Sequence, residues 1–177
     1  MLGIALTHKS YSNEFRQGHD PGLDKHNQRM EFLGDSVLGL VIAHHFYASK
    51  RKTAEGGLTR LKAMTVCESA LKQVAEKLEL GRMLRFGKGE IATGGLTRTS
   101  NLADAMEAVI GAIYLGADFE TAQKFVIKHF SDILDNPETV EGSKDFKSAL
   151  QEYLAKKNHQ RPDYELIAAE GPDHDKE

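Results

Sequence analysis

Two pairs of acidic residues stand at helical spacing in stretches that are otherwise almost wholly apolar. Glu31 and Asp35 are four residues apart, and Asp104 and Glu107 are three apart, so each pair lies on one face of an α-helix. A carboxylate that is buried without a partner is costly, and like charges at this spacing repel each other. The sequence therefore predicts that a cation neutralises both pairs.

Small residues near both pairs would allow the two helix backbones to approach closely and bring the four carboxylates together. Four oxygen ligands without histidine or cysteine favour a hard cation, Mg²⁺ with Mn²⁺ as a substitute, over zinc. Such sites commonly hydrolyse phosphate esters. We thus expect a metal-dependent phosphodiester hydrolase, with a phosphatase of small substrates as an alternative. The small residues are Gly34, Gly39, Ala103, Ala105, Ala108, Gly111 and Ala112.

Two other interpretations of the four acids stay open from spacing alone. The acids could be partly exposed and form helix caps and surface ion pairs without any metal. A di-iron helical bundle would also gather carboxylates, but its usual Glu-x-x-His repeat is missing. Gly34 stands three residues after Glu31, and Ile110 stands three residues after Glu107.

Composition indicates an ordinary soluble protein with one domain and an appendage. The chain has 177 residues, of which 40% are hydrophobic and 28% charged. The single cysteine, Cys67, excludes an internal disulfide framework. The net charge of −3 does not by itself indicate a nucleic-acid binder. Without an apolar run of about eighteen residues or a signal-like start, we expect a cytoplasmic protein that uses no membrane.

Hydrophobic periodicity predicts that helices position the acids, and it offers no pair of strands. The periodic stretches are residues 27–47, 57–80, 101–115 and 118–134. Residues 11–27 and the glycine-rich residues 82–99 are predicted to be loops. A linker is predicted at 135–144, followed by a short helix at 145–157 and a single strand at 162–168.

Three runs stand out around the acids: ALTHKS at 5–10, HNQRMEFLGDSVL at 26–38 and NLADAMEA at 101–108. The second resembles the signature of the ribonuclease III family, the first is similar to the segment that leads to it, and the third to the family's second acidic motif. On this resemblance, residues 1–134 are a catalytic domain and 135–144 a linker. Residues 145–177 resemble the N-terminal part of a double-stranded RNA-binding domain.

The resemblance implies an all-α endonuclease domain, followed by a truncated α+β RNA-binding domain that has only its helix and first strand. It implies a homodimer that cuts both strands of double-stranded RNA by a Mg²⁺-bound water, leaving 5′-phosphates and 3′-hydroxyls with short 3′ overhangs. The expected substrates are ribosomal RNA precursors and structured mRNAs, and no small-molecule cofactor is expected. The alternative is a cleavage-inactive protein that binds double-stranded RNA on the same fold.

Carried over residue by residue, the resemblance assigns further roles. Phe32 is implied as a dimer contact, with ordinary core packing as the alternative. Gln28 stands where the family usually has another glutamate, so we expect it to position substrate or outer-shell water. The implied metal ligands and catalytic residues are Glu31, Asp35, Asp104 and Glu107, and the expected RNA contacts are Gln151, Glu152, His174, Lys88 and Arg98.

Overall fold

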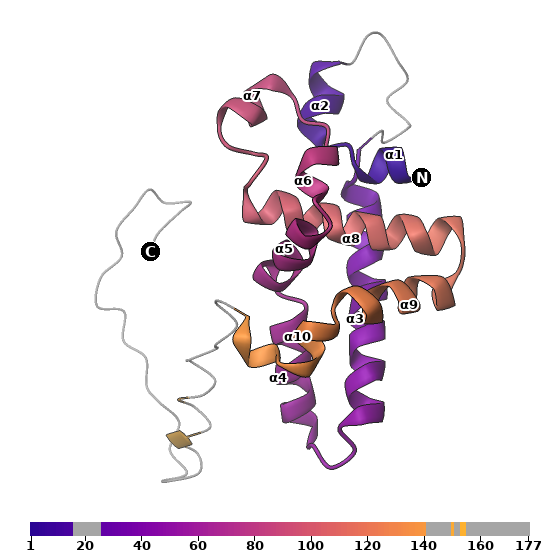
Figure 1. Cartoon of the computed structure of the whole chain (residues 1–177), viewed down its shortest axis with the longest axis vertical. Coiled ribbons are helices and arrows are strands. Elements are labelled where there is room, and N and C mark those ends of the chain that lie inside the picture. Colours follow the sequence, from indigo (N-terminus) through magenta and orange to yellow (C-terminus); the bar gives the residue numbers. More distant parts are fainter. Residues whose placement is uncertain (16–25, 141–149, 151–152, 155–177) are drawn as a thin grey trace. The chain divides into compact units, whose positions relative to one another are not determined.

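The computed structural model describes residues 1–15, 26–140, 150 and 153–154 (Figure 1). The chain divides into two units, Met1–Lys144 and Asp145–Glu177, and the helices given below belong to the first. Within the described residues, none of the helices combines the length and the apolar character that crossing a membrane requires.

Two long helices, α3 (Gln28–Ser49) and α8 (Thr99–Gly116), cross at the centre of the first unit (Figure 1). They share the most extensive helix–helix interface among the described elements. Both are apolar on most sides, and side chains such as Leu38, Met106 and Ile110 are wholly buried between them and their neighbours. These two helices confirm the segments predicted to carry the acids.

Glycines set the distance between the two central helices. A methyl group on Gly34 of α3 would overlap the backbone carbonyl of Glu107, and one on Gly111 of α8 would overlap the carbonyl of Met30. The predicted close approach of the helix backbones is therefore present. Gly39 has a different neighbour, because a methyl group there would contact the Lys62 side chain, 3.4 Å from its Nζ, on another helix.

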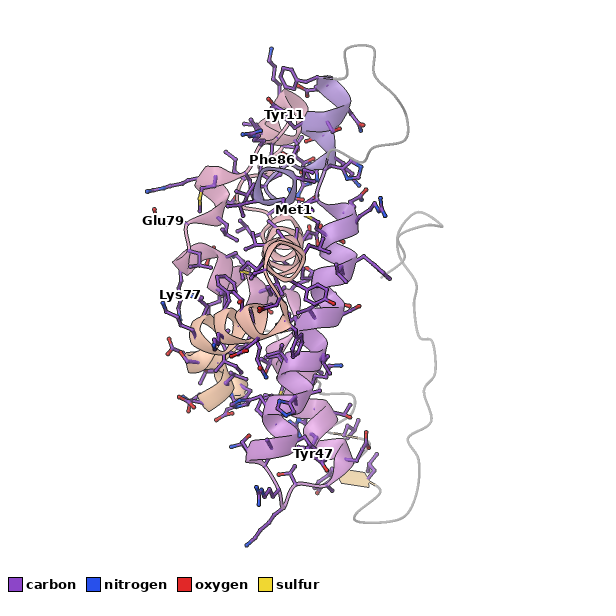
Figure 2. The ribbon with its side chains drawn as sticks, turned by 90° about the vertical axis from the view of Figure 1, so that its right-hand side faces the viewer. Met1, Tyr11, Tyr47, Lys77, Glu79 and Phe86 are labelled. Atoms are coloured by element: carbon purple, nitrogen blue, oxygen red, sulfur yellow. The ribbon has the colours of Figure 1, made fainter. Side chains whose placement is uncertain are left out.

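Shorter helices surround this central pair and cover its apolar faces. Phe86, from the segment after α6, packs on the His8 ring with centroids 5.1 Å apart, at the same end of the unit as Tyr11, whereas Tyr47 lies at the opposite end, near the end of α3 (Figure 2). The surrounding elements are α1 (Leu2–Ala5), α2 (Lys9–Glu14), α4 (Glu55–Thr65), α5 (Glu68–Lys77), α6 (Leu80–Met83), α7 (Lys88–Ala92), α9 (Phe119–His129), α10 (Ser131–Asp135) and the 3₁₀ helix η1 (Pro137–Thr139).

Within the described ranges the fold is helical, as predicted, and its single β feature is an isolated parallel bridge between Thr7 and Arg85. This bridge joins the N-terminal segment to the chain after α6. It is reinforced by two backbone hydrogen bonds, from His8 N–H to the Arg85 carbonyl at 3.0 Å and from Arg85 N–H to the Leu6 carbonyl at 2.9 Å.

Several predicted boundaries were wrong. The predicted helix at 57–80 is interrupted, because the backbone of Cys67 is extended and starts the new helix α5. The predicted helix at 118–134 is likewise divided into α9 and α10 at Phe130.

Two predicted loops also contain helix. Residues 11–14 belong to α2, and the glycine-rich stretch at 82–99 includes the five-residue helix α7. Of the predicted linker and tail, residues 135–140, which include the end of α10 and η1, and the helical residues 150, 153 and 154 are described. The rest of the linker, the predicted strand and the remainder of the short helix lie outside the described residues.

Candidate active site

Four acidic residues meet across the junction of α3 and α8. Glu31 and Asp35 lie in the first half of α3, and Asp104 and Glu107 in the first half of α8. Because Gly34 contacts the backbone of Glu107, its neighbour Asp35 stands next to the acidic face of α8. Asp35 is exposed, whereas the other three acids are half-buried. The structure thus brings together residues that are some seventy positions apart in sequence.

The electrostatics of the four acids demonstrate that they interact. Burial raises the pKa of Glu107 to about 8, and the negative charges of Asp35, Glu31 and Asp104 add to that rise. Burial likewise raises the pKa of Glu31, with a further contribution from Asp104 on the other helix. At the junction of α3 and α8, burial and mutual repulsion therefore disfavour the ionised form of these carboxylates.

Two residues near the acids were not identified from the sequence. Glu68, the first residue of α5, adds to the raised pKa of Asp104 after burial itself, so it is a fifth acid in the neighbourhood. Lys9, the first residue of α2, is a cation that opposes the pKa rise of Glu31 and Asp104. Both approach through tertiary packing, and helical spacing within α3 and α8 carries no signal for either.

The carboxylates are close enough to affect one another but are not arranged as a finished coordination sphere. In the described part of the chain, no three or more histidine, cysteine, aspartate or glutamate side chains converge as a ready metal site.

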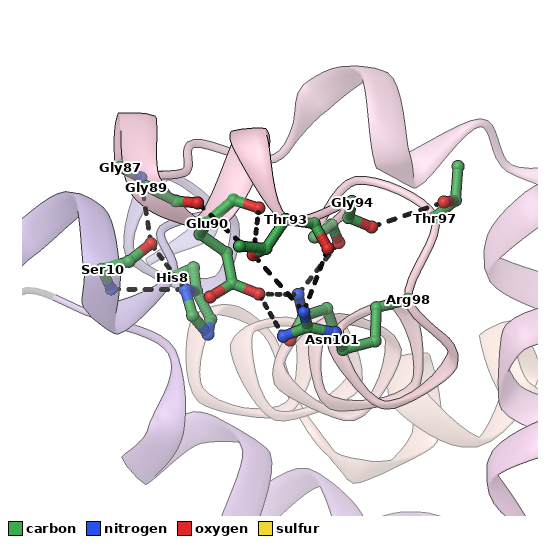
Figure 3. A network of polar contacts seen from close by, with 11 residues as sticks. His8, Ser10, Gly87, Gly89, Glu90, Thr93, Gly94, Thr97, Arg98 and Asn101 are labelled. Atoms are coloured by element: carbon green, nitrogen blue, oxygen red, sulfur yellow. Dashed lines mark hydrogen bonds and ion pairs between the residues drawn. The ribbon is translucent and has the colours of Figure 1, made fainter.

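A polar network fixes the glycine-rich segment against the start of α8 (Figure 3). The Asn101 side-chain amide donates to Glu90 Oε1 at 2.9 Å and to the Gly95 carbonyl at 2.9 Å. Arg98 Nη1 donates to the same Glu90 oxygen at 2.6 Å. The hydrogen bond from Asn101, and then the Arg98 charge, lower the pKa of Glu90. The network holds α7 against α8 one turn before Asp104.

The two basic residues expected to contact RNA differ in their surroundings. Arg98 is committed to the network, since its guanidinium pairs with Glu90 and also donates to the Thr93 carbonyl at 3.2 Å. The Lys88 side chain is exposed and forms no ion pair with another described residue. The Arg98 guanidinium is therefore engaged within the chain, whereas the Lys88 ammonium has no anionic partner among the described residues; phosphate contact stays a prediction for both.

The remaining predicted residues lie on the surface or outside the described part. Gln28 is exposed at the first position of α3, one turn before Glu31. Phe32 is 77% exposed, so core packing is excluded for it within this chain. Gln151, Glu152 and His174 lie outside the described residues.

The fold and the acidic junction define a helical nuclease domain. A solved structure of the nuclease domain of ribonuclease III from Campylobacter jejuni superposes with a TM-score of 0.66 at 38% sequence identity, covering 74% of this chain and 85% of that one. It is described as showing structural flexibility in a region involved in dimer formation. A second structure of the same domain gives a TM-score of 0.65 at 38% identity, covering 74% of this chain and 82% of that one.

Sequence comparisons agree with the structural ones. A family model described as ribonuclease-III-like matches residues 1–134. Ribonuclease 3 of Clostridium perfringens is 43% identical over 98% of this chain and 71% of the relative. Ribonuclease 3 of Desulforamulus reducens is 46% identical over 99% of this chain and 70% of the relative. The chain belongs to the ribonuclease III family and is a ribonuclease III endonuclease.

Proposed function

We propose that this protein hydrolyses both strands of double-stranded RNA at the junction of α3 and α8, leaving 5′-phosphates and 3′-hydroxyls with short 3′ overhangs. The observation that carries the proposal is that two close-packed helices bring Glu31 and Asp35 next to Asp104 and Glu107, where burial and the neighbouring negative charges raise the pKa of Glu107 to about 8. The substrates we propose are ribosomal RNA precursors and structured mRNAs in the cytoplasm.

The donor chemistry of the site fits a divalent cation. All four side chains are carboxylates, which suit Mg²⁺ or Mn²⁺, and their excess negative charge is what such an ion would neutralise. Glu31, Asp35, Asp104 and Glu107 would hold it after rotating toward one another, since they do not converge as they stand. When bound, the ion supplies Lewis acidity at the phosphate and lowers the pKa of water.

Several residues of this chain position the reacting groups. Gly34 and Gly111 hold the two acid-bearing helices together, and the Glu90 network fixes the start of α8. We assign substrate or outer-shell positioning to Gln28 and phosphate contact to Lys88. Arg98 acts through Glu90. Gln151, Glu152 and His174 are proposed RNA contacts in residues 145–177, the N-terminal part of an RNA-binding domain that follows the catalytic residues 1–134 and the linker 135–144.

A homodimer accounts for the exposed apolar residues of α3. Phe32 is 77% exposed, Leu40 58% and Tyr47 72%, and such large side chains on one helix favour an interface. The Campylobacter jejuni nuclease domain, which is similar to this chain, is described as having a region involved in dimer formation. We therefore place Phe32 in the contact between two copies.

The proposal is tested by a cleavage assay on labelled duplex RNA of about 30 base pairs, roughly twice the span of one double-stranded RNA-binding domain. We expect cutting with Mg²⁺, binding without cutting with Ca²⁺, and no cutting with EDTA. Glu107→Gln should abolish cutting and keep the fold, whereas the control Glu120→Gln, on exposed α9, should cut like the wild type.

Three outcomes would contradict parts of the proposal. Binding of duplex RNA without cutting in Mg²⁺ would favour the cleavage-inactive alternative. Hydrolysis of p-nitrophenyl phosphate without cutting of duplex RNA would indicate a phosphatase of small substrates. Glu107→Gln with near wild-type activity would remove Glu107 from the metal site.

A further inference from the structure

The segment that precedes Lys9 is hydrogen-bonded to the start of the acid-bearing helix α3. The Thr7 carbonyl accepts a hydrogen bond from Asn27 N–H at 2.9 Å, and the Asn27 carbonyl accepts one from Glu31 N–H at 2.9 Å. Two hydrogen bonds therefore connect residue 7 to residue 31. Lys9 follows two positions later as the first residue of α2.

The far end of α2 is also held, so Lys9 does not belong to a loose N-terminal arm. The Glu14 carboxylate accepts hydrogen bonds from the backbone N–H groups of Lys88 and Gly89 at 2.9 and 3.1 Å. At the start of α2, the Ser10 hydroxyl accepts one from Gly87 N–H at 2.9 Å (Figure 3). A side chain on Gly87 would meet Glu14 Oε1 at 2.6 Å, which shows how tightly α2 rests on this segment.

The electrostatics agree with the placement of Lys9 that the hydrogen bonds of Thr7 and Asn27 define. Burial raises the pKa of Glu31 on α3 and of Asp104 on α8, and the Lys9 ammonium opposes both rises. Yet Lys9 forms no ion pair within 4.0 Å with another described residue, and its side chain is exposed.

We propose that Lys9 is a further substrate-contacting residue, whose ammonium binds a phosphate oxygen of the RNA strand held at the four carboxylates. The proposal rests on the proposed function. A divalent cation bound by the acids would weaken their attraction for Lys9, and a phosphate of the RNA would offer the ammonium another anion. Lys9 also contributes to the lowered pKa of Glu90, but that carboxylate already has Asn101 and Arg98 as partners. An ammonium is a compact point charge that suits such a contact, and the fixed α2 backbone brings it there without reordering the chain.

The test compares Lys9→Met and Lys9→Arg with Lys128→Met, which removes an exposed lysine from α9. Two quantities are measured on the same duplex: kcat/KM in Mg²⁺, and the salt dependence of Kd in Ca²⁺. Lys9→Met should lower kcat/KM by about 10- to 100-fold. It should also make the slope of log Kd against log salt shallower by about 0.7–0.9 for each phosphate that the variant no longer binds. Lys9→Arg should keep most of the activity, and Lys128→Met all of it.

A purely screening role for Lys9 gives the opposite pattern and would overturn the proposal. Without Lys9 the acids would bind Mg²⁺ more tightly, so Lys9→Met would need less Mg²⁺ for half-maximal activity and would keep the wild-type salt slope. Failure of the proposed function looks different, because the wild type would bind duplex RNA in Ca²⁺ and not cut it in Mg²⁺. The salt slope of Kd would still report on Lys9 in that case, and wild-type binding too weak to measure would overturn both proposals.

Discussion

Gly34 and Gly111 face each other where α3 and α8 cross, so that a side chain on either would collide with the backbone of the opposite helix. Glu107 lies one turn before Gly111 on the same face of α8, and Asp35 directly follows Gly34 on α3. The two glycines therefore fix the separation of the acids on the two helices. Any change in the helix–helix distance is a change in the geometry of the site.

Gly34→Ala is accordingly expected to destabilise the protein and to reduce cleavage. Alanine is normally the better helix former by about 0.5–1 kcal/mol. Here the methyl group meets a backbone carbonyl that cannot rotate away, and overpacking of this kind costs about 1–3 kcal/mol. Urea unfolding would measure the net loss. Gly56→Ala in α4 is the matched control, because nothing lies within 4 Å of a methyl group there, and it should stabilise the protein. Equal effects of the two substitutions would contradict the packing argument.

The metal-free protein should become less stable as the pH rises from 6.5 to 8. Burial and neighbouring acids raise the pKa of Glu107 from 4.5 to about 8, so the folded state keeps a proton that the unfolded state has already lost. Burial lowers the pKa of His8 and of His129 from 6.5. The two histidines therefore change the stability with pH mainly below pH 6.5, outside this pH range. Because Glu107 is partly exposed, solvent screening limits the expected fall in the free energy of unfolding to the order of 1 kcal/mol. This corresponds to a Tm that is lower by about 2–4 °C.

Thermal melts in EDTA across this pH range test the Glu107 argument. Glu107→Gln should remove the decline, because the amide does not titrate, and Glu120→Gln should keep it. Mg²⁺ should raise the Tm of the wild type at the upper end of the range, since only the folded site gathers the four carboxylates. A wild-type Tm that is constant between the two pH values would show that Glu107 titrates normally.

Asn101→Ala is expected to lower stability by about 1–3 kcal/mol. The side chain is buried and donates to both Glu90 and the Gly95 carbonyl, so its removal leaves two acceptors short of a donor. Chemical denaturation measures the loss. Thr97→Ala is a suitable comparison, because the Thr97 hydroxyl makes only an exposed hydrogen bond to the Gly94 carbonyl at 3.4 Å, and its loss should be close to neutral. Similar losses for both variants would mean that the network does not stabilise the glycine-rich segment.

Phe32→Glu should convert the proposed dimer into a monomer. Burying a charge in an apolar contact costs at least about 2 kcal/mol, which weakens self-association roughly thirtyfold or more. Sedimentation velocity over a range of protein concentrations would detect the change. Met83→Glu, which alters an exposed apolar residue of α6, should leave association unchanged. If both variants sediment like the wild type, Phe32 lies outside the interface.

Local periodicity was sufficient to predict the helices that carry the acids. Glu31 with Asp35 and Asp104 with Glu107 share helix faces by spacing alone, and the small residues beside them correctly indicated a close approach of the two helices. The interruption at Cys67 escaped prediction because the apolar period continues through it while the backbone is extended.

Other features depend on segments that meet only in the folded chain. The segment that carries Lys9 is joined to the start of α3 by the hydrogen bond between Asn27 N–H and the Thr7 carbonyl, and Glu68 is brought near Asp104 because α5 packs on α8. The partner of Arg98 is Glu90, which lies eight residues earlier on α7, in a stretch predicted to be a loop. For this reason the sequence carried no signal for the ion pair between Arg98 and Glu90.

Glu14 and Asn27 anchor the two ends of the segment between α2 and α3 independently of each other. Glu14 is tied to Lys88 and Gly89, and Asn27 is tied to Thr7. Each anchor joins its helix to a different part of the unit, so a substitution that weakens one should leave the other in place. Lys9 and Glu31 would therefore keep their positions independently of each other.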